Sequence, residues 1–236
     1  MFADQGSWDI RCEWGPRGLA ALAPTSDVVI LVDVMSFSTC VSVGTSRGAE
    51  IYPWRCRDAS AADFARSIGA ELAGTRKAGG YSLSPTSLSS LPAGARLVLP
   101  SPNGATLSLA AGQVPLLAGC LRNARTVAEA AMRIGRRIAV IPAGERWRED
   151  GSLRPAFEDL VGAGAIIQHV KGGRSPEARS ALAAFQGVRS DLKATLAACA
   201  SGLELTEMGY AHDLAWMADL DADEVAPRFS EGAYRA

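Results

Sequence analysis

Cysteine and histidine are both scarce in this chain of 236 residues, and each shortage disfavours a class of site. The five cysteines contain no C-x-x-C pair, which argues against a disulfide framework and against structural zinc. The two histidines, His169 and His212, leave little material for a multi-histidine metal centre or for a histidine-based phosphatase. This composition predicts a reducing compartment, and we expect a cytoplasmic protein.

An excess of charge is also missing, because 24 Lys and Arg oppose 25 Asp and Glu. No basic stripe is interleaved with aromatic residues, so the electrostatic pattern of a nucleic-acid-binding protein is absent. No apolar run approaches the roughly 20 residues of a membrane span, and the first residues do not resemble a secretory signal. We expect a small-molecule substrate, and neither a nucleic-acid nor a membrane partner.

Two widespread phosphate motifs are absent as well. The chain has no G-x-x-x-x-G-K-[ST] loop, and Asp33-Val34-Met35 lacks the second aspartate of the D-x-D motif. Gly162-Ala163-Gly164 is not a dinucleotide fingerprint, because it follows a helix start rather than a strand. These small residues instead predict close helix packing.

The most informative feature present is the segment 28–34, a continuous apolar strand that ends on the carboxylate of Asp33. Ser38 and Thr39 follow shortly after it. Such a run is typical of a strand in a parallel sheet covered on both faces. Ligands of open α/β sheets bind outside the carboxyl ends of the strands, where Asp33 would lie. The two hydroxyls would stand near free N–H groups at a helix start, which suit an anion. A carboxylate beside an anion site suggests a divalent cation that holds a phosphate.

Strands and helices alternate along the first two thirds of the chain, which predicts an α/β fold with a mostly parallel sheet and helices on both faces. We treat 1–236 as one domain, with a sub-lobe boundary near 145–155 as the alternative. The Gly-, Ser- and Pro-rich segment 75–92 is expected to be a long loop that is either functional or disordered. The predicted strands are 28–34, 49–54, 70–74, 95–99, 114–118 and 137–141, and the helices of the C-terminal third are 155–170, 176–185, 191–201 and 213–220.

In a parallel sheet every strand-end turn opens onto the same edge. Asn103-Gly104 suits close backbone approach to an oxyanion, although the same pair is common in ordinary turns. Glu158 and Asp159 lie at the start of a predicted helix whose other residues are small and apolar. The two acids either complement the helix dipole or bind a metal. The strand-end residues that we expect at this edge are Asp33, Arg76, the run Ser101-Pro102-Asn103-Gly104, Asn123 and the run Gly144-Glu145-Arg146.

Two further side chains have an ordinary and a functional interpretation. Cys40 lies near the expected helix start, where its thiol is either a nucleophile of lowered pKa or a small buried core residue, and the second is favoured. His212 precedes a predicted helix and is either a site residue or part of its cap.

Taken in order, several motifs resemble the 2-phosphosulfolactate phosphatase (ComB-like) family, and the resemblance covers nearly the whole chain. It implies a magnesium-dependent acid phosphatase with its own α/β fold, acting on the phosphate ester of a small hydroxy acid. The motifs are Asp33-Val34-Met35-Ser36-Phe37-Ser38-Thr39, Ser101-Pro102-Asn103-Gly104-Ala105, Leu121-Arg122-Asn123-Ala124, Ala143-Gly144, the run from Phe157 to Gly164, and Gly209-Tyr210-Ala211-His212-Asp213.

The chain departs from the family pattern at two places. Ser36 stands where the resemblance would place an arginine, and Gly74-Thr75-Arg76 stands in place of G-E-R. The missing cation weakens the case for a sulfonate and favours another phosphorylated hydroxy acid.

The resemblance and the residues together give one hypothesis, in which Mg²⁺ held by Asp33, Glu158 and Asp159 polarises the phosphoryl group. Activated water is the expected nucleophile, with Asp33 or Cys40 as alternatives. A non-catalytic anion-binding protein and a nucleotide-dependent transferase are the competing functions, and base rates favour a homodimer. The residues expected to bind the substrate are Ser38, Thr39, Arg76, Asn103, Gly104, Asn123 and Asp213.

Overall fold

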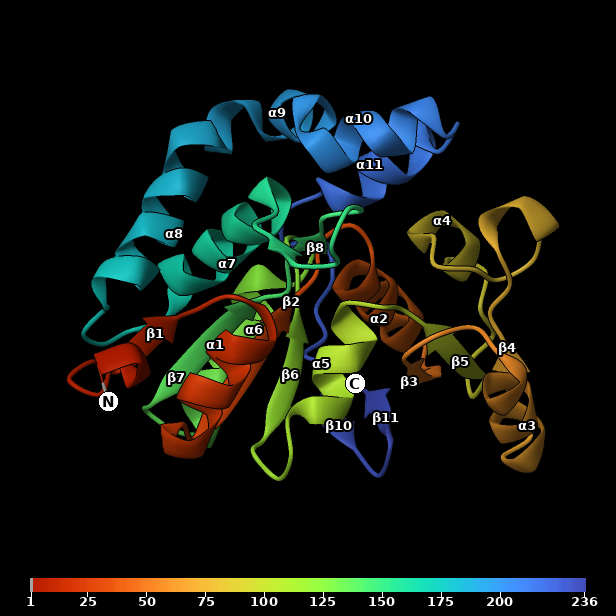
Figure 1. Ribbon diagram of the computed structural model, residues 1–236, viewed down its shortest axis with the longest axis horizontal. Coiled ribbons are helices and arrows are strands. Elements are labelled where there is room, and N and C mark those ends of the chain that lie inside the picture. Colours follow the sequence, from red (N-terminus) through yellow and green to blue (C-terminus); the bar gives the residue numbers. More distant parts are fainter. Residues whose placement is uncertain (1) are drawn as a thin grey trace.

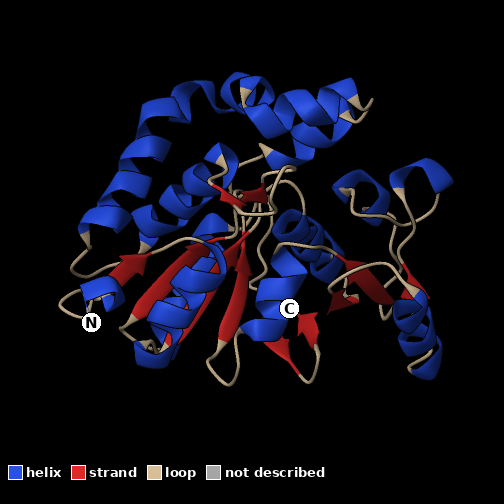
Figure 2. Cartoon of the chain, in the orientation of Figure 1, coloured by secondary structure: helices blue, strands red, loops and turns tan. Residues whose placement is uncertain are grey.

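The computed structural model describes residues 2–236, and a nine-stranded sheet crosses its whole length (Figures 1 and 2). The sheet has two parallel parts, joined by an antiparallel hairpin. In spatial order the strands are β1 (Ile10–Cys12), β7 (Ile138–Pro142), β2 (Val28–Val32), β6 (Leu116–Gly119), β10 (Arg228–Ser230), β11 (Ala233–Arg235), β3 (Glu50–Trp54), β5 (Arg96–Pro100) and β4 (Glu71–Leu72).

Helices cover both faces of the larger parallel part, as the apolar run of β2 predicts. Val28, Ile30 and Val32 pack with residues of α6 (Ala124–Ile134) and α7 (Phe157–His169). Val29 and Leu31 face the opposite way, toward α1 (Gly15–Leu22), α2 (Phe37–Ser46) and α5 (Gly104–Ala110). Successive side chains of a strand point to opposite faces, so a strand that is apolar throughout is buried on both sides. The predicted α/β fold is confirmed.

The C-terminal third is helical up to residue 217, and Figure 1 shows its helices along one side of the molecule and across the top of the view. No element was predicted after residue 220, where β10 and β11 return the chain to the middle of the sheet. Each has three residues and mixes charged with apolar side chains, so neither shows the apolar run of a buried strand. The remaining C-terminal helices are α8 (Pro176–Val188), α9 (Leu192–Ala198), α10 (Ala200–Glu207) and α11 (Ala211–Met217).

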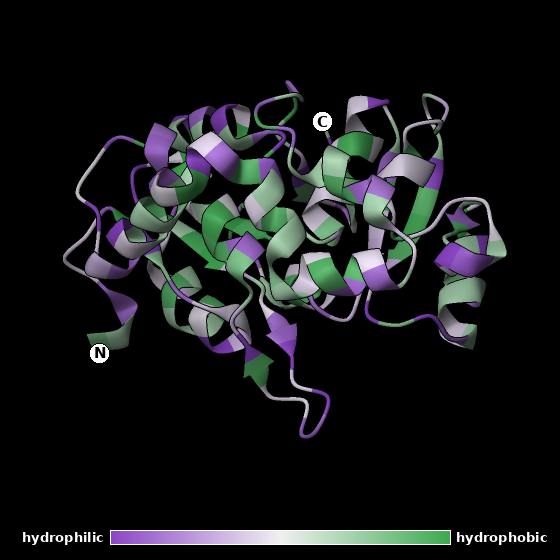
Figure 3. Cartoon of the chain, turned by 90° about the horizontal axis from the view of Figure 1, so that it is seen from above, coloured by the Kyte–Doolittle hydropathy of each residue, from purple (hydrophilic) through white to green (hydrophobic). Residues whose placement is uncertain are grey.

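The small residues of α7 bring it against α8, as the sequence predicts. A Cβ built on Gly164 would lie 2.0 Å from the backbone oxygen of Ala181, so only glycine permits this approach. Hydrophobic residues gather in the strands and on the inward sides of the helices (Figure 3).

Segment 75–92 is mainly a loop, as expected, with two short helical pieces. It contains a 3₁₀ helix, Arg76–Ala78, and the short helix α4 (Pro85–Leu88), and α3 (Ala59–Ser67) lies before it in the chain. Residues 145–155, the alternative boundary, form a hairpin of β8 (Glu145–Arg146) and β9 (Leu153–Arg154). No helix within residues 2–236 is long and apolar enough to cross a membrane.

Candidate active site

The turn between β2 and α2 holds the Asp33 carboxylate against backbone donors. Its Oδ1 accepts a hydrogen bond from the Phe37 amide at 3.0 Å, and its Oδ2 accepts one from the Gly104 amide at 2.8 Å. The Ser38 hydroxyl accepts from the Asp33 amide at 3.0 Å and bonds to the Leu31 carbonyl at 3.3 Å. Asp33 is 6% exposed. This turn therefore fixes a buried carboxylate at the carboxyl end of β2.

The hydroxyls expected to bind an anion make internal bonds instead. Thr39 donates to the Val34 carbonyl at 2.8 Å, and Ser38 closes the Asp33 turn. The Phe37 and Ser38 amides at the start of α2 also bond to Asp33, through its side chain and its carbonyl. These groups shape the turn, and their role toward substrate stays a prediction.

The start of α7 supplies the second fixed carboxylate. Asp159 accepts hydrogen bonds from the Val34 amide at 2.7 Å and the Gly144 amide at 2.8 Å. It thereby joins the segments that follow β2 and β7. Its neighbour Glu158 is 2% exposed and accepts from the Cys199 thiol at 3.5 Å.

A fourth carboxyl group, that of Glu145 on β8, completes what we call the acidic cluster: Asp33, Glu145, Glu158 and Asp159. Burial, followed by the charges of Glu145 and Glu158, raises the pKa of Asp33 to about 7. Burial and the charges of Asp33 and Glu158 raise the pKa of Asp159 well above its ordinary value. The pKa of Glu145 is raised by burial first and by Glu158 in addition, although a hydrogen bond from Asn103 opposes the shift. Burial and mutual repulsion thus disfavour the ionised form of these carboxyl groups, and a bound cation would offset that penalty.

Two glycines allow the backbone to approach these carboxylates. A Cβ on Gly104 would lie 2.7 Å from Asp33 Oδ2 and 2.3 Å from the Phe37 ring. Gly144 has φ +70°, and a Cβ there would meet a Leu153 methyl at 2.7 Å. Larger residues at either position would displace the amide donor from its carboxylate.

The donor chemistry of the acidic cluster fits a hard divalent cation. None of the salt bridges in residues 2–236 pairs a cation with Asp33, Glu158 or Asp159. The same residues contain no ready-made group of three His, Cys, Asp or Glu side chains that could hold a metal. Mg²⁺ commonly uses one or two carboxylates and keeps several waters, so it does not require such a cage.

Arg76 is the cation that lies beside the start of α2. It donates to the Ser36 hydroxyl at 2.8 Å and to the Leu83 carbonyl. Asp213, which is fully buried, lies 3.2 Å from Arg76 Nη1, and its other oxygen accepts from the Ser84 hydroxyl at 2.6 Å. Arg76 also lies over a tyrosine ring, Tyr210. Asp213, which the sequence interpretation assigned to substrate binding, thus contacts the guanidinium and orients it.

The two predicted asparagines lie in different surroundings. Asn103 is half-buried and donates to Glu145 Oε2 at 2.9 Å, so it contacts the acidic cluster. Asn123 is fully buried, donates to the Ala118 carbonyl at 3.1 Å and accepts from the Cys120 amide at 2.9 Å. Its amide closes the turn after β6, and its contact with phosphate stays a prediction.

Burial bears on the two interpretations of Cys40. Cys40 is fully buried, and burial raises the pKa of its thiol well above the ordinary value, which favours a core residue over a nucleophile. His212 does not precede its helix as predicted, because α11 begins at Ala211 and its N-cap residue is Tyr210. The His212 side chain is 55% exposed, with Nε2 3.7 Å from Asp213 Oδ1, and its role at the site stays a prediction.

Two residues that contact the predicted site residues were given no role in the sequence analysis, namely Glu145 and Ser84. Glu145 stood in a predicted strand-end turn but received no role, although an acid after a strand end was the signal that selected Asp33. Ser84, which supports Asp213, lies in the segment that was predicted as a loop and carries no such signal.

The comparisons with known proteins agree with this arrangement. The family model described as 2-phosphosulpholactate phosphatase matches residues 19–232. "Probable 2-phosphosulfolactate phosphatase" from Carboxydothermus hydrogenoformans is 29% identical over 84% of each chain. A protein of the same name from Gloeobacter violaceus is 28% identical over 86% of this chain and 89% of the relative. The "2-phosphosulfolactate phosphatase" from Methanothermobacter thermautotrophicus is 27% identical over 88% of each.

The matched range includes every residue of the acidic cluster as well as Arg76 and Asp213. The chain belongs to the 2-phosphosulpholactate phosphatase family, a family of phosphoric monoester hydrolases.

Proposed function

We propose that this protein is a Mg²⁺-dependent phosphatase that hydrolyses the phosphate monoester of a small hydroxy acid, in the manner of 2-phosphosulfolactate and water giving sulfolactate and phosphate. One observation carries the proposal. Four buried or half-buried carboxyl groups, those of the acidic cluster, share the carboxyl ends of β2 and β7 and the start of α7. The names of the family and of its relatives support the same reaction.

Glu158, with Asp33 or Asp159, would hold the magnesium ion. When bound, Mg²⁺ supplies Lewis-acid polarisation of a phosphoryl oxygen. The two aspartates are already aimed by backbone amides, so their orientation costs no reorganisation during the reaction.

The remaining groups serve the phosphoryl oxygens and the leaving alcohol. The Arg76 guanidinium, held by Asp213, pairs with phosphate oxygens, because its planar fork matches them. A water molecule attacks phosphorus, the phosphorus–oxygen bond to the alcohol breaks, and the alcohol oxygen takes a proton. Glu145 would give that proton and take one back from the attacking water, since burial and the charge of Glu158 raise its pKa above the ordinary value.

Phosphate release with Mg²⁺ or with chelator tests the proposal, using 2-phosphosulfolactate, 2-phospholactate, 2-phosphoglycolate and an aryl phosphate. We expect Mg²⁺-dependent turnover in the wild type, reduced about 100-fold or more in Asp33→Asn. Asp58→Asn is the matched control, because Asp58 caps α3 through the Ala61 amide and asparagine caps equally well. The ranking of the four substrates measures how far Ser36, which replaces the expected arginine, weakens recognition of the sulfonate ester.

No turnover of any of these esters by folded protein would overturn the proposal. Tight phosphate binding without turnover would then favour the non-catalytic anion-binding alternative.

A further inference from the structure

A cavity of about 520 Å³ adjoins the acidic cluster and is not used by the mechanism above. It lies among α1, α5 and the β8–β9 hairpin, all near one another in Figure 1. Trp14, Leu107 and Leu153 give it large apolar walls. Cavities of roughly 300–1,000 Å³ with apolar walls and few polar groups are typical of organic ligand sites.

The cavity and the acidic cluster share residues. Asn103 and Glu145 both line the cavity, and the hydrogen bond between them closes its inner side. Asn103 directly precedes Gly104, whose amide holds Asp33. When the phosphate group of an ester lies at the acidic cluster, the organic part of the ester therefore extends either into this cavity or into solvent.

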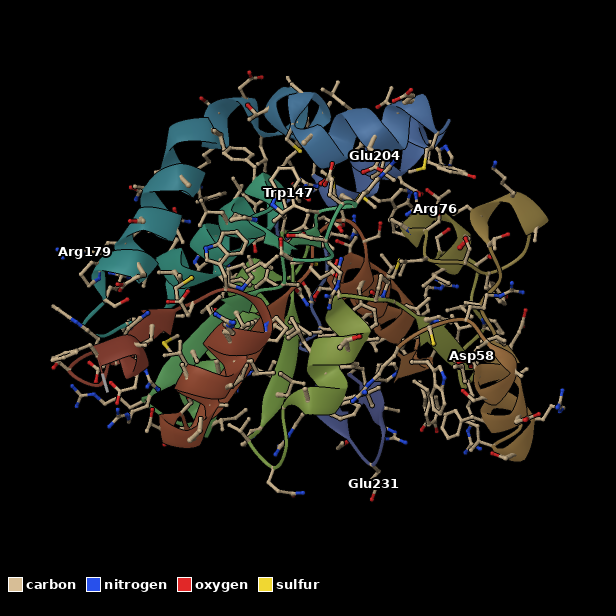
Figure 4. All side chains as sticks on the ribbon, viewed as in Figure 1. Asp58, Arg76, Trp147, Arg179, Glu204 and Glu231 are labelled. Carbon is tan, nitrogen blue, oxygen red and sulfur yellow. The ribbon has the colours of Figure 1, made fainter. Side chains whose placement is uncertain are left out.

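The charges of the cavity limit what that part can be. Arg17 and Arg146 line it and are exposed, so they can pair with one carboxylate at the opening. Glu145 and Asn103, the polar groups that the cavity shares with the site, bring no positive charge to a second anionic group. Trp147, labelled in Figure 4, extends from the same hairpin and is 50% exposed.

We infer that this cavity binds the organic part of the ester, and that the substrates of this chain are phosphate esters of hydroxy acids with an apolar side chain of aryl size. The inference rests on the proposed function and narrows its substrate class. A compact ester that carries a sulfonate would leave the apolar walls of the cavity uncovered.

The kcat/KM values for 2-phospho-3-phenyllactate, 2-phospholactate and 2-phosphosulfolactate provide the first test. We expect the phenyl ester to exceed 2-phospholactate by about tenfold or more, because burial of a ring adds favourable apolar contact. Equal or lower values for the phenyl ester would overturn the inference while leaving the phosphatase proposal intact.

A variant that fills the cavity provides the second test. Thr106→Trp places a ring inside the cavity, since Thr106 lines it from α5. We expect it to lower kcat/KM for the phenyl ester about tenfold and to leave 2-phospholactate within about twofold. Leu109→Trp is the matched control, because Leu109 lies on the same helix, is 39% exposed and does not line the cavity. An equal loss for both substrates contradicts the assignment.

Binding of 3-phenyllactate, followed by calorimetry, tests the cavity without turnover. We expect measurable binding to the wild type and weaker binding to Thr106→Trp and to Leu153→Ser, which removes an apolar wall from the partly exposed hairpin. Binding that neither variant alters would overturn the inference. Binding together with a complete lack of phosphatase activity would separate failure of the proposed reaction from failure of the cavity assignment.

Discussion

The buried carboxylates of the candidate site form two sets that differ in their partners. One set is Asp213 alone, and the other consists of Asp33 and Asp159. Asp213 is fully buried, but a guanidinium, a hydroxyl and a backbone amide surround it. Asp33 and Asp159 are buried to a similar degree, yet the bonds given above come from backbone amides, and their pKa values are raised by burial and by other acids. Both sets belong to motifs of the same family pattern.

The difference separates positioning from reaction chemistry. A buried carboxylate with a cation beside it has its charge balanced and orients its partner, as Asp213 orients Arg76. Buried carboxylates that raise one another's pKa are stabilised in the ionised form only when a cation binds beside them. The acidic cluster is therefore where a cation is expected to act, and Asp213 supports the cation that the chain already provides.

The largest expected effect comes from removing charge from the acidic cluster. Asp159→Asn should lower kcat about 100-fold or more, because the site loses a carboxylate and gains an amide N–H that opposes a backbone donor. Steady-state kinetics with Mg²⁺ measure this, with Asp219→Asn as a control for a partly exposed carboxylate that pairs with Arg122. An Asp159→Asn variant that stays fully folded and within twofold of wild type would contradict the division between the two sets.

Crowding the same turn should cost stability. Gly104→Ala places a methyl group against Asp33 and the Phe37 ring, so we expect a loss of about 1–3 kcal/mol in the free energy of unfolding. Denaturant titration measures it. Gly187→Ala on α8 is the matched control, because a Cβ there meets nothing within 4 Å, and it should be neutral or stabilising. A destabilised control with an unaffected Gly104 variant would reverse the argument.

Removing the charge of Asp213 should weaken substrate binding more than it slows the chemical step. Asp213→Asn leaves Arg76 without its buried counter-charge, so we expect KM to rise about tenfold with a smaller change in kcat. Arg76→Lys should act through the same contact, and the double variant should therefore lose less than the sum of the two single losses. Additive losses would indicate that Asp213 does not act through Arg76.

The smallest expected effect is on the pH dependence of stability. The pKa of Asp33 rises on folding from 3.8 to about 7, so its unfolded state releases the proton first and stability falls as pH increases between these values. In chelator, Tm should therefore drop from pH 5.5 to pH 7.5 by a few degrees, since about 1 kcal/mol corresponds to roughly 2–4 °C.

Asp33→Asn should reduce that drop, and Mg²⁺ should reduce it in the wild type by favouring the ionised carboxylate. Thermal melts at both pH values measure these differences. A Tm that rises over this range in chelator would contradict the assigned protonation of the acidic cluster.

Several features could be predicted from the sequence because they depend on local chemistry. The apolar run before Asp33 required burial on two faces, and the carboxyl end of that strand determined where an acid could act. Gly162 and Gly164 indicated close packing of α7. The order of motifs from Asp33 to Asp213 identified the family.

Other features depended on contacts between distant segments. The β10–β11 hairpin joins the two parallel parts through short strands whose own sequence carries no strand signal. Similarly, Asn103 and Asn123 both follow strands and are both followed by small residues, yet only Asn103 contacts an acid of the cluster.

By itself, the sequence determined the α/β fold, the family and the edge of the sheet where the polar residues gather, because periodicity and strand ends are local properties. Only the tertiary structure decided which carboxylates face one another, that Asp213 holds Arg76 and that an apolar cavity adjoins Glu145. Charge balance and cavity shape arise from side chains that are far apart in the chain, and folding alone brings them together.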